Sequence, residues 1–323
     1  MLAFAESVVD SCHGIRDDPQ EVESFLNNPT TVFICSRHNP RGMGFLMRKP
    51  FRVQFKLKED VDFGQVDAIV FLGIRLASQT PVFAVLLQEL IPGSEEFISD
   101  LRRMIATKQD PDFEEINLVS LALSLLEWNR VTKFCSFCAG SLDSLRGGIK
   151  KHCSSCKLAQ YPRIDPSIIV LILNPSGEKV LLARSPQYPK KMMTLVSGFL
   201  DASESVELAV IREVKEEVGL DVDAASIRYV TSQSWTAGRS LMLGCIARVS
   251  SETIVIADPK EIEMASWFER SQVLQGLSFW RDPDQNLDSL GSTEFFTPPP
   301  GLMAHFLLMS WISGKLDSLL SAR

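Results

Sequence analysis

The sequence predicts an α/β protein in which two domains flank a small cysteine-rich module. Three observations predict this: segments with alternating apolar and polar residues, segments with apolar residues at helical spacing, and four closely spaced cysteines near the middle. The 323 residues suffice for two domains of roughly 150 residues and a module. A net charge of −7 argues against a general nucleic-acid-binding surface, although a local basic groove stays open. No apolar run approaches the ~18 residues that cross a bilayer, so no membrane partner is expected.

The first residues do not resemble a targeting segment. Glu6 and Asp10 precede the first arginine, Arg16, whereas signal peptides begin with basic residues and mitochondrial presequences are poor in acids. The final Ser321-Ala322-Arg323 differs from a peroxisomal Ser-Lys-Leu signal. We expect an intracellular, cytoplasmic location, and a mitochondrial or peroxisomal one stays open as an alternative.

The segment before the cysteines predicts a mixed α/β domain over residues 1–130. Period-2 alternation or apolar runs predict strands at 51–57, 68–74 and 82–87. A helix is expected from Ser94 onward, with Phe97 and Leu101 on its apolar face, and another at 118–128. Gly42-Met-Gly44 begins a dinucleotide-binding pattern but lacks the third glycine, because residue 47 is methionine. This domain indicates no chemistry by itself.

Four cysteines are spaced like the ligands of a zinc ion, as Cys135-x2-Cys138-x14-Cys153-x2-Cys156. Each Cys-x-x-Cys turn directs two thiolates toward one ion, and four thiolates leave no open position, so the Zn²⁺ would be structural. Two disulfides or inert thiols are the alternative. His152 could replace one cysteine, although a solvent-facing histidine is the simpler interpretation. The three isolated cysteines are expected in the core: Cys12, Cys35 and Cys245.

The second half of the chain predicts another α/β domain. A helix is expected from Ser205 to Val218, ended by Gly219. A C-terminal helix is expected at 302–320 after a proline-rich turn, and a flexible loop at 282–297. The expected strands cover 167–173, 180–182, 227–231, 241–249 and 264–268.

The helix from Ser205 carries three glutamates, Glu213, Glu216 and Glu217, on one face. A solvated acidic surface would explain them if they stood alone. However, Gly198-x5-Glu204-x7-Arg212-Glu213-Val214-x-Glu216-Glu217-x-Gly219-Leu220 matches every position of the Nudix box, so the chain resembles the Nudix hydrolases. Clustered carboxylates suit Mg²⁺ or Mn²⁺, which neutralise a diphosphate and ionise water.

The resemblance extends to the zinc-ribbon NADH pyrophosphatase branch of these hydrolases. The matching segments are Leu125-Leu-Glu-Trp128, Phe134-Cys135, the four cysteines, Tyr161-Pro-Arg-x-Asp165-Pro166 and Ser232-Gln233. This resemblance implies a Nudix α/β/α sandwich with a mixed sheet at 161–323, a zinc ribbon at 131–160 and the N-terminal domain before it. It also implies a homodimer that cleaves NAD(H) into AMP and nicotinamide mononucleotide; some members remove an NAD cap from RNA.

The resemblance assigns roles to residues of the box and to two others. It implies that Glu213 and Glu217 bind the metal and that Glu216 is a ligand or the base for water. Glu261 and the backbone carbonyl of Ser197 would be further ligands, although Glu261 alone would more often be a surface carboxylate. Arg212 would orient the carboxylates, and Glu204 would support the loop.

The resemblance also implies a set of substrate-binding residues. Tyr161 and Phe199 would stack on the base or nicotinamide, although either could be a packing residue instead, and Ala304 would contact substrate through its backbone. The branch pattern S-Q-P-W-P-F-P-x-S is here Ser232-Gln-Ser-Trp-Thr-Ala-Gly-Arg-Ser240, which loses three prolines and an aromatic residue. The candidates in this loop are Gln233, Ser234, Trp235 and Ser240.

The altered loop leaves the substrate open. ADP-ribose, another dinucleotide or NAD-capped RNA would use the same chemistry as NAD(H). A non-catalytic nucleotide-binding protein is a further alternative, disfavoured because the metal-binding glutamates are all present.

Overall fold

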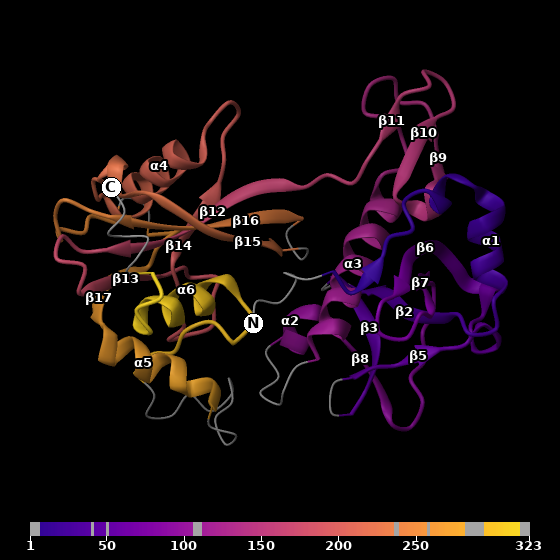
Figure 1. Ribbon diagram of the computed structural model, residues 1–323, viewed down its shortest axis with the longest axis horizontal. Helices are drawn as coiled ribbons and strands as arrows, with labels where there is room; N and C mark the ends of the chain where they lie inside the picture. Colours follow the sequence, from indigo (N-terminus) through magenta and orange to yellow (C-terminus); the bar gives the residue numbers. More distant parts are fainter. Residues whose placement is uncertain are drawn as a thin grey trace. The chain divides into compact units, whose positions relative to one another are not determined.

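The computed structural model describes residues 7–39, 42–49, 52–105, 112–235, 239–256, 259–281 and 294–316 (Figure 1). These residues fall into two compact units. The N-terminal unit comprises the described residues up to 164 together with Arg239, and the C-terminal unit comprises 165–235 and the described residues from 240 onward. The expected domain boundaries at 130/131 and 160/161 stay predictions.

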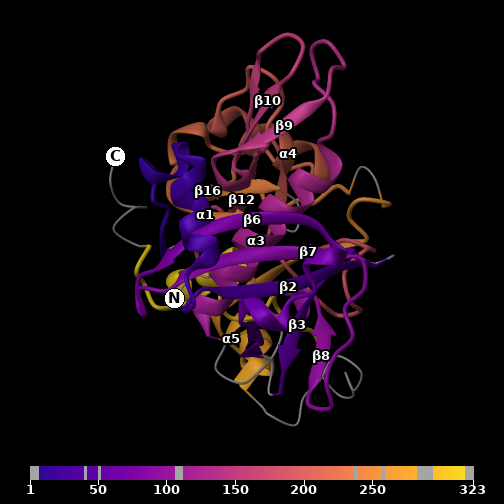
Figure 2. The same cartoon turned by 90° about the vertical axis from the view of Figure 1, so that its right-hand side faces the viewer.

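The N-terminal unit is built on a mixed sheet. Its central strands lie in the order β6, β7, β2, β3 (Figure 2), and β2 and β7 are parallel whereas the other neighbours are antiparallel. The described strands are β1 Val9–Asp10, β2 Val32–Asn39, β3 Gly42–Arg48, β4 Arg52–Val53, β5 Phe55–Lys56, β6 Val66–Arg75, β7 Pro81–Leu87 and β8 Glu96–Ser99. The expected strands 68–74 and 82–87 are thus confirmed as β6 and β7. The expected strand at 51–57 is divided, because Gln54 lies between β4 and β5, and residue 51 lies outside the described residues.

Helices cover both faces of this sheet. Helix α1 (Pro19–Asn27) contributes Val22, Phe25 and Leu26 to one apolar core with Phe33 and Phe71. Helix α3 (Phe113–Val131) lies along the other face (Figure 1), and it confirms the helix expected at 118–128. As predicted, the thiols of Cys12 and Cys35 are buried.

The helix expected from Ser94 is wrong for its first half. Residues Glu96–Ser99 form strand β8, which pairs with β3 so that Phe97 is opposite Met47, and only Leu101–Ile105 form a helix, α2. The apolar residues Phe97 and Ile98 fit either period over so short a run, and the open edge of β3 decides the outcome because it supplies backbone partners.

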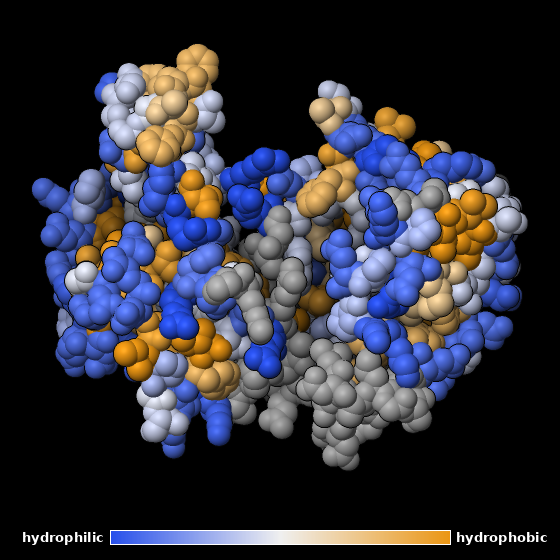
Figure 3. Space-filling model, turned by 180° about the vertical axis from the view of Figure 1, so that it is seen from behind, coloured by the Kyte–Doolittle hydropathy of each residue, from blue (hydrophilic) through white to orange (hydrophobic). Residues whose placement is uncertain are grey.

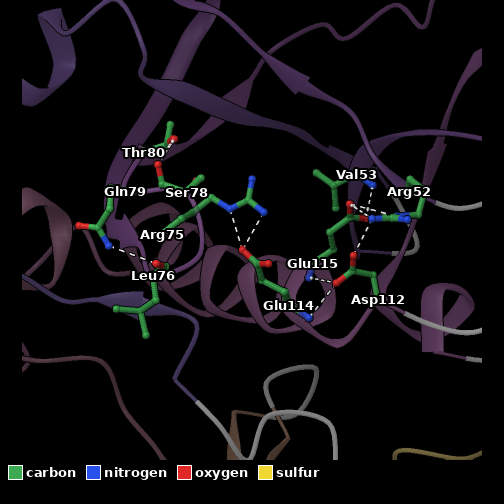
Figure 4. A network of polar contacts seen from close by, with 10 residues as sticks. All are labelled: Arg52, Val53, Arg75, Leu76, Ser78, Gln79, Thr80, Asp112, Glu114 and Glu115. Atoms are coloured by element: carbon green, nitrogen blue, oxygen red, sulfur yellow. Dashed lines mark hydrogen bonds and ion pairs between the residues drawn. The ribbon is translucent and has the colours of Figure 1, made fainter.

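Carboxylates fix the start of α3 to the sheet (Figure 4). Asp112 caps the helix by accepting hydrogen bonds from two backbone N–H groups of its first turn. The buried carboxylate of Glu115 accepts from Nε of Arg52 at 3.1 Å, and Arg52 also pairs with Asp112. Arg75 pairs with Glu114 at 2.7 Å. The helix is therefore held by ion pairs at its N-terminal end as well as by packing.

The four clustered cysteines flank a small antiparallel sheet of the same unit: Cys135 and Cys138 precede it, Cys153 ends its middle strand and Cys156 follows that strand. Its strands are β9 (Leu142–Leu145), β10 (Lys150–Cys153) and β11 (Ala159–Gln160), with β10 in the middle. The turn between β9 and β10 packs closely on β6, since Cβ atoms at Gly147 and Gly148 would lie 2.8 Å and 2.6 Å from side-chain atoms of Phe71 and Val70. Glycines with positive φ allow this approach.

The C-terminal unit is a sandwich in which helices cover both faces of a mixed sheet. The sheet has the order β15-β16-β12-β13-β17, with β14 paired to β12, and β12 and β16 are parallel. The strands are β12 Asp165–Leu173, β13 Lys179–Arg184, β14 Val196–Phe199, β15 Arg228–Trp235, β16 Ser240–Arg248 and β17 Met264–Glu269. The five strands expected from the sequence all occur, and β14 was not expected.

Alternate residues of β12 separate two apolar cores. Ile168 and Val170 pack against α4 (Val206–Val218), whereas Ile169 and Leu171 pack with residues of α5 (Arg270–Ser278) and α6 (Met303–Ile312) on the other face (Figure 1). The predicted α/β/α sandwich is therefore confirmed. Cys245 is buried in the core against α4, as predicted.

Two expectations near the C-terminus are corrected in part: the helix expected at 302–320 occurs as α6 but is shorter, and the end of the loop expected at 282–297 is buried. Helix α6 ends at Ile312, because Gly314 adopts a φ of 73° and the chain turns. The segment 282–297 was expected to be a flexible loop; 282–293 lie outside the described residues, but Phe296 and Thr297 are fully buried. Phe296 stacks on Phe279, so the end of this segment belongs to the core.

The sequence analysis found no apolar run long enough to cross a membrane, and the helices of the structure can be compared with that expectation. Within the described part of the chain, no helix combines the length and apolarity that a membrane-spanning segment requires.

Candidate active site

The Nudix box occupies β14, the following loop and α4. Ser205 caps α4 by accepting a hydrogen bond from the backbone N–H of Leu208 at 3.3 Å, and Gly219 ends it with a φ of 71°, as expected. Four buried residues anchor the helix to the sheet: Ala209, Val210, Val214 and Val218. Because they form one stripe, the glutamates of the box lie on the remaining surface.

Arg212 connects the acidic residues of the box. Its Nε and Nη2 donate to both carboxylate oxygens of Glu204, at 2.9 Å and 2.8 Å, and Nη2 also donates to the carbonyl of Phe199 at 2.9 Å. Its Nη1 donates to Glu213 at 2.8 Å and to Glu216 at 3.0 Å. All five N–H donors are therefore used. These hydrogen bonds raise the pKa of Arg212 and lower that of Glu204.

Burial and mutual repulsion disfavour the ionised form of Glu217. Burial first, and then the charges of Glu213, Glu261 and Glu216, raise its pKa to about 8. Burial also raises the pKa of Glu213, against the opposing effect of Arg212. Glu261 comes from a different part of the sequence, yet its charge contributes to the raised pKa of Glu217 in the box.

The crowding of these carboxylates fits a divalent cation. Oxygen ligands and several negative charges are what Mg²⁺ and Mn²⁺ require, and a bound cation would relieve the repulsion at Glu217. Ser197, expected to contribute its carbonyl, lies in β14 directly before Gly198 and pairs with Ile169 of β12. Glu213, Glu216, Glu217, Glu261 and the Ser197 carbonyl stay the predicted ligands.

The four cysteines form a compact site that fits zinc. Their sulfur atoms all lie within 4.8 Å of one another, and no other group of three or more His, Cys, Asp or Glu side chains in the described ranges converges so closely. Sγ of Cys135 is 3.6 Å from that of Cys156, and Cys138 is 3.5 Å from Cys153. The backbone N–H of Cys156 points to Cys153 at 3.4 Å and lowers the pKa of that thiol, which favours the thiolate.

The expected substrate-binding residues differ in exposure. Phe199 and Tyr161 are more than half exposed, so their rings are available for stacking; Phe199 belongs to the C-terminal unit and Tyr161 to the N-terminal unit. Trp235 and Ser240 are opposite each other in the β15–β16 pair, where Ser240 is buried and Ser234 is half-buried. Residues 236–238 of the altered loop lie outside the described residues.

Gln233 was expected to bind substrate, but its side chain forms hydrogen bonds with backbone groups of the protein. It is 1% exposed, its Nε2 donates to the carbonyl of Gly301 at 2.7 Å, and its Oε1 accepts from the N–H of Met303 at 2.8 Å. These bonds hold the turn before α6 in place, and Ala304, the expected backbone contact, follows in the first turn of that helix and is buried. Sequence reasoning missed this link, although the glycine after three prolines signalled a fixed turn.

Comparison with known proteins agrees with this architecture. The NUDIX domain model matches residues 163–288, and the model of the NADH pyrophosphatase zinc ribbon domain matches residues 130–161. The chain belongs to the Nudix hydrolase family, which confirms the predicted family and its zinc-ribbon branch.

Three relatives illustrate the similarity. The human NAD-capped RNA hydrolase NUDT12 is 36% identical over 207 residues, which cover 62% of this chain and 42% of the human protein. The NAD-capped RNA hydrolase NudC of Pseudomonas putida is 35% identical over 205 residues, covering 63% of this chain and 71% of that protein. Nudix hydrolase 19, chloroplastic, of Arabidopsis thaliana is 29% identical over 291 residues, covering 78% and 66%. The chain thus spans less than half the length of the human relative.

Proposed function

We propose that this protein hydrolyses the pyrophosphate bond of a nucleoside diphosphate derivative, with NAD(H) as substrate and AMP and nicotinamide mononucleotide as products. The observation that carries the proposal is the arrangement of Glu213 and Glu216 on α4, where Nη1 of Arg212 holds them at 2.8 Å and 3.0 Å, while burial and then neighbouring charges raise the pKa of Glu217 on the same helix. Several carboxylates on one helix, with no cationic partner for Glu217 among the described residues, are typical of a divalent-cation site.

Each residue has a distinct role in the proposed reaction. Mg²⁺ or Mn²⁺, when bound, neutralises the diphosphate oxygens and makes water more acidic. Glu213, Glu217, Glu261 and the Ser197 carbonyl would hold the metal. Glu216, which is more exposed than Glu213 and Glu217, would hold it too or accept the proton of the attacking water. The water oxygen bonds to one phosphorus, the P–O bond to the bridging oxygen breaks, and that oxygen leaves with the other phosphate.

Arg212 and Glu204 act on this reaction by positioning. Because Arg212 binds Glu204, Glu213, Glu216 and the carbonyl of Phe199 at the same time, it fixes the loop and the helix as one rigid piece. Zn²⁺ bound by the four cysteines is proposed as structural only, because a closed tetrathiolate has no position for substrate.

The substrate is proposed from the relatives and from exposed aromatic side chains. Two of the relatives are NAD-capped RNA hydrolases by name, and the exposed rings of Phe199 and Tyr161 suit stacking on adenine or nicotinamide. NAD-capped RNA is therefore the second substrate candidate, and ADP-ribose and other dinucleotides are further ones. A homodimer is proposed from the resemblance alone.

A panel of substrates with product identification tests the proposal. NADH, NAD⁺, ADP-ribose, a diadenosine polyphosphate and NAD-capped RNA are incubated with the full chain and Mg²⁺ or Mn²⁺, and products are identified by mass spectrometry. We expect AMP and nicotinamide mononucleotide from NADH, and a loss of turnover of at least about a hundredfold for Glu217→Gln. Glu207→Gln, an exposed glutamate of the same helix, is the matched control. Full activity of Glu217→Gln would remove the catalytic assignment, and binding without hydrolysis of any substrate would favour a nucleotide-binding protein.

A further inference from the structure

The zinc ribbon and its flanking residues differ in charge from the rest of the chain. Residues 130–164 contain seven lysines and arginines and one acidic residue, Asp143, whereas the remaining residues contain 26 basic and 39 acidic ones. A zinc ion with four thiolates contributes two negative charges, so this segment stays positive with zinc bound. It is a local basic region in an acidic protein.

Not all of these cations are free to bind a ligand. Arg130 pairs with Glu127, Arg146 pairs with Asp17, and the ammonium of Lys151 is buried and donates to backbone carbonyls. The exposed lysines of the segment are Lys133 and Lys157. Lys157 donates to a carbonyl of its own turn, that of Ser154, and no carboxylate among the described residues pairs with it.

Exposed aromatic rings accompany these lysines. Phe134 is 68% and Phe137 is 79% exposed, on either side of the ligand Cys135. Gln160 at the end of β11 donates to Cys135 and to Ser136, at 3.4 Å and 3.0 Å, so β11 lies against this turn. Lys157 lies two residues before β11 begins. Figure 3 shows hydrophobic side chains gathered on the projecting ribbon, at the upper left of that view. Large exposed apolar side chains in such a group indicate a binding surface.

The combination indicates a single-stranded nucleic acid as the ligand. Lysines bind phosphates, and aromatic rings stack on unpaired bases of any sequence. A second copy of the chain is a weaker candidate, because a symmetric contact through this surface would place lysines of one copy against lysines of the other. Asp143, the one carboxylate of the segment, is on β9 opposite His152 of β10.

We propose that Lys133, Phe134, Phe137 and Lys157, the ribbon surface, bind the single-stranded RNA body of an NAD-capped RNA. This inference rests on the proposed function, because it assigns the part of the substrate beyond the dinucleotide. A free dinucleotide has no RNA body. The ribbon surface therefore separates the two substrate candidates: its loss weakens the binding and hydrolysis of capped RNA and leaves NADH hydrolysis unchanged.

Binding of uncapped RNA tests the inference without depending on catalysis. A fluorescent single-stranded RNA of about a dozen nucleotides is titrated with the full chain at several salt concentrations. We expect Phe134→Ala/Phe137→Ala to weaken binding about tenfold or more, because each lost base stack is costly. We expect Lys133→Ala/Lys157→Ala to reduce the slope of log affinity against log salt by about 1.4, at about 0.7 for each phosphate on a single strand.

Matched controls and a second readout complete the test. Lys49→Ala/Lys315→Ala removes two exposed charges elsewhere, Tyr229→Ala removes an exposed ring, and neither should change RNA binding. Zinc content shows whether each ribbon variant is folded. If the phenylalanine variant does not fold, RNA binding by the lysine variant alone tests the inference. Wild-type protein that does not bind the RNA, or ribbon variants that bind it as tightly as wild type, would overturn the inference. So would a wild-type dimer that the phenylalanine variant converts to monomer with RNA binding unchanged. NADH turnover of the wild type tests the proposed function separately.

Discussion

The carboxyl group of Glu213 lies against the α-carbon of Gly198, so closely that a β-carbon on residue 198 would be 2.0 Å from Cδ of Glu213. Gly198 is held in β14 by its pairing with Ile168, and Glu213 is held by Arg212. Neither residue can leave its position without losing these contacts. The first glycine of the Nudix box is therefore required by the position of a predicted metal ligand.

Gly198→Ala is expected to reduce activity far more than stability. The new methyl group must displace the carboxylate of Glu213, whose flexible side chain can move at small cost to folding but only by leaving its place in the metal site. We expect turnover of NADH to fall at least about a hundredfold and the thermal midpoint to change by only a few degrees, of order 1 kcal/mol. Gly14→Ala, where a β-carbon meets nothing within 4 Å, is the control. Wild-type turnover in Gly198→Ala would contradict the role of Glu213.

Arg212→Lys should impair catalysis although the charge is kept. A lysine has one nitrogen and cannot bind both oxygens of Glu204, the Phe199 carbonyl, Glu213 and Glu216 together. We expect the metal concentration for half-maximal rate to rise about tenfold or more, because the ligands are no longer oriented by their neighbours. Metal-titrated turnover measures this, with Lys215→Arg on the same helix as control. An unchanged metal dependence would show that Arg212 serves the fold alone.

The box could be predicted from sequence because its constraints are local. Ser205 and Gly219 mark the ends of α4 by capping chemistry, and the stripe of valines shows which side is buried. In contrast, Phe97 was expected in a helix, because its strand depends on a distant edge of the sheet that no local pattern reveals. Phe296 lies within 282–297, which was expected to be a flexible loop, yet it is buried against Phe279. Contacts between distant segments determine both cases.

The candidate site divides in the same way. The predicted metal ligands of α4 follow from the motif, and Glu261 was assigned by resemblance, but the hydrogen-bond partners of Gln233 could not be predicted from either. An amide side chain matches a substrate contact and a backbone contact equally well in sequence. The structure distinguishes the two, because Nε2 and Oε1 of Gln233 form hydrogen bonds with the backbone of Gly301 and Met303.

Gln233→Ala should therefore destabilise the C-terminal unit. It leaves the Gly301 carbonyl and the Met303 N–H without their partner in a buried place, which costs about 2–4 kcal/mol. The KM for NADH should rise as well, because the turn that precedes Ala304 loosens. Chemical denaturation and steady-state kinetics on the same preparation test this, with Ser234→Ala as the neighbouring control. A raised KM with unchanged stability would instead indicate direct contact between Gln233 and substrate.

Zinc removal is expected to unfold the ribbon. The segment has few apolar residues of its own, and metal binding supplies folding free energy to such modules. Cys135→Ser should lower the zinc content well below one ion per chain and reduce the yield of soluble protein, whereas the exposed Ser155→Ala should keep both. Elemental analysis and circular dichroism measure the outcome. A well-folded variant without zinc would contradict the structural role.

The ion pair between Lys56 and Glu96 should make the β3–β8 edge sensitive to acid. Burial acts to raise the pKa of Glu96, but hydrogen bonds from Lys56 at 2.7 Å and from the N–H of Gly93 at 2.9 Å outweigh it, so the pKa is lowered in the folded protein. A carboxyl whose pKa is lower when folded adds stability above its unfolded pKa of about 4.3, and this stability is lost as the pH falls through the folded value. Glu96→Gln should thus reduce the free energy of opening β8 by about 1 kcal/mol at pH 7 and by progressively less below about pH 4. Hydrogen exchange of the β8 amides measures this, with the exposed Glu95→Gln as control. If Glu96→Gln reduced the free energy of opening β8 by the same amount at pH 7 and below about pH 4, the charge of Glu96 would not contribute to it.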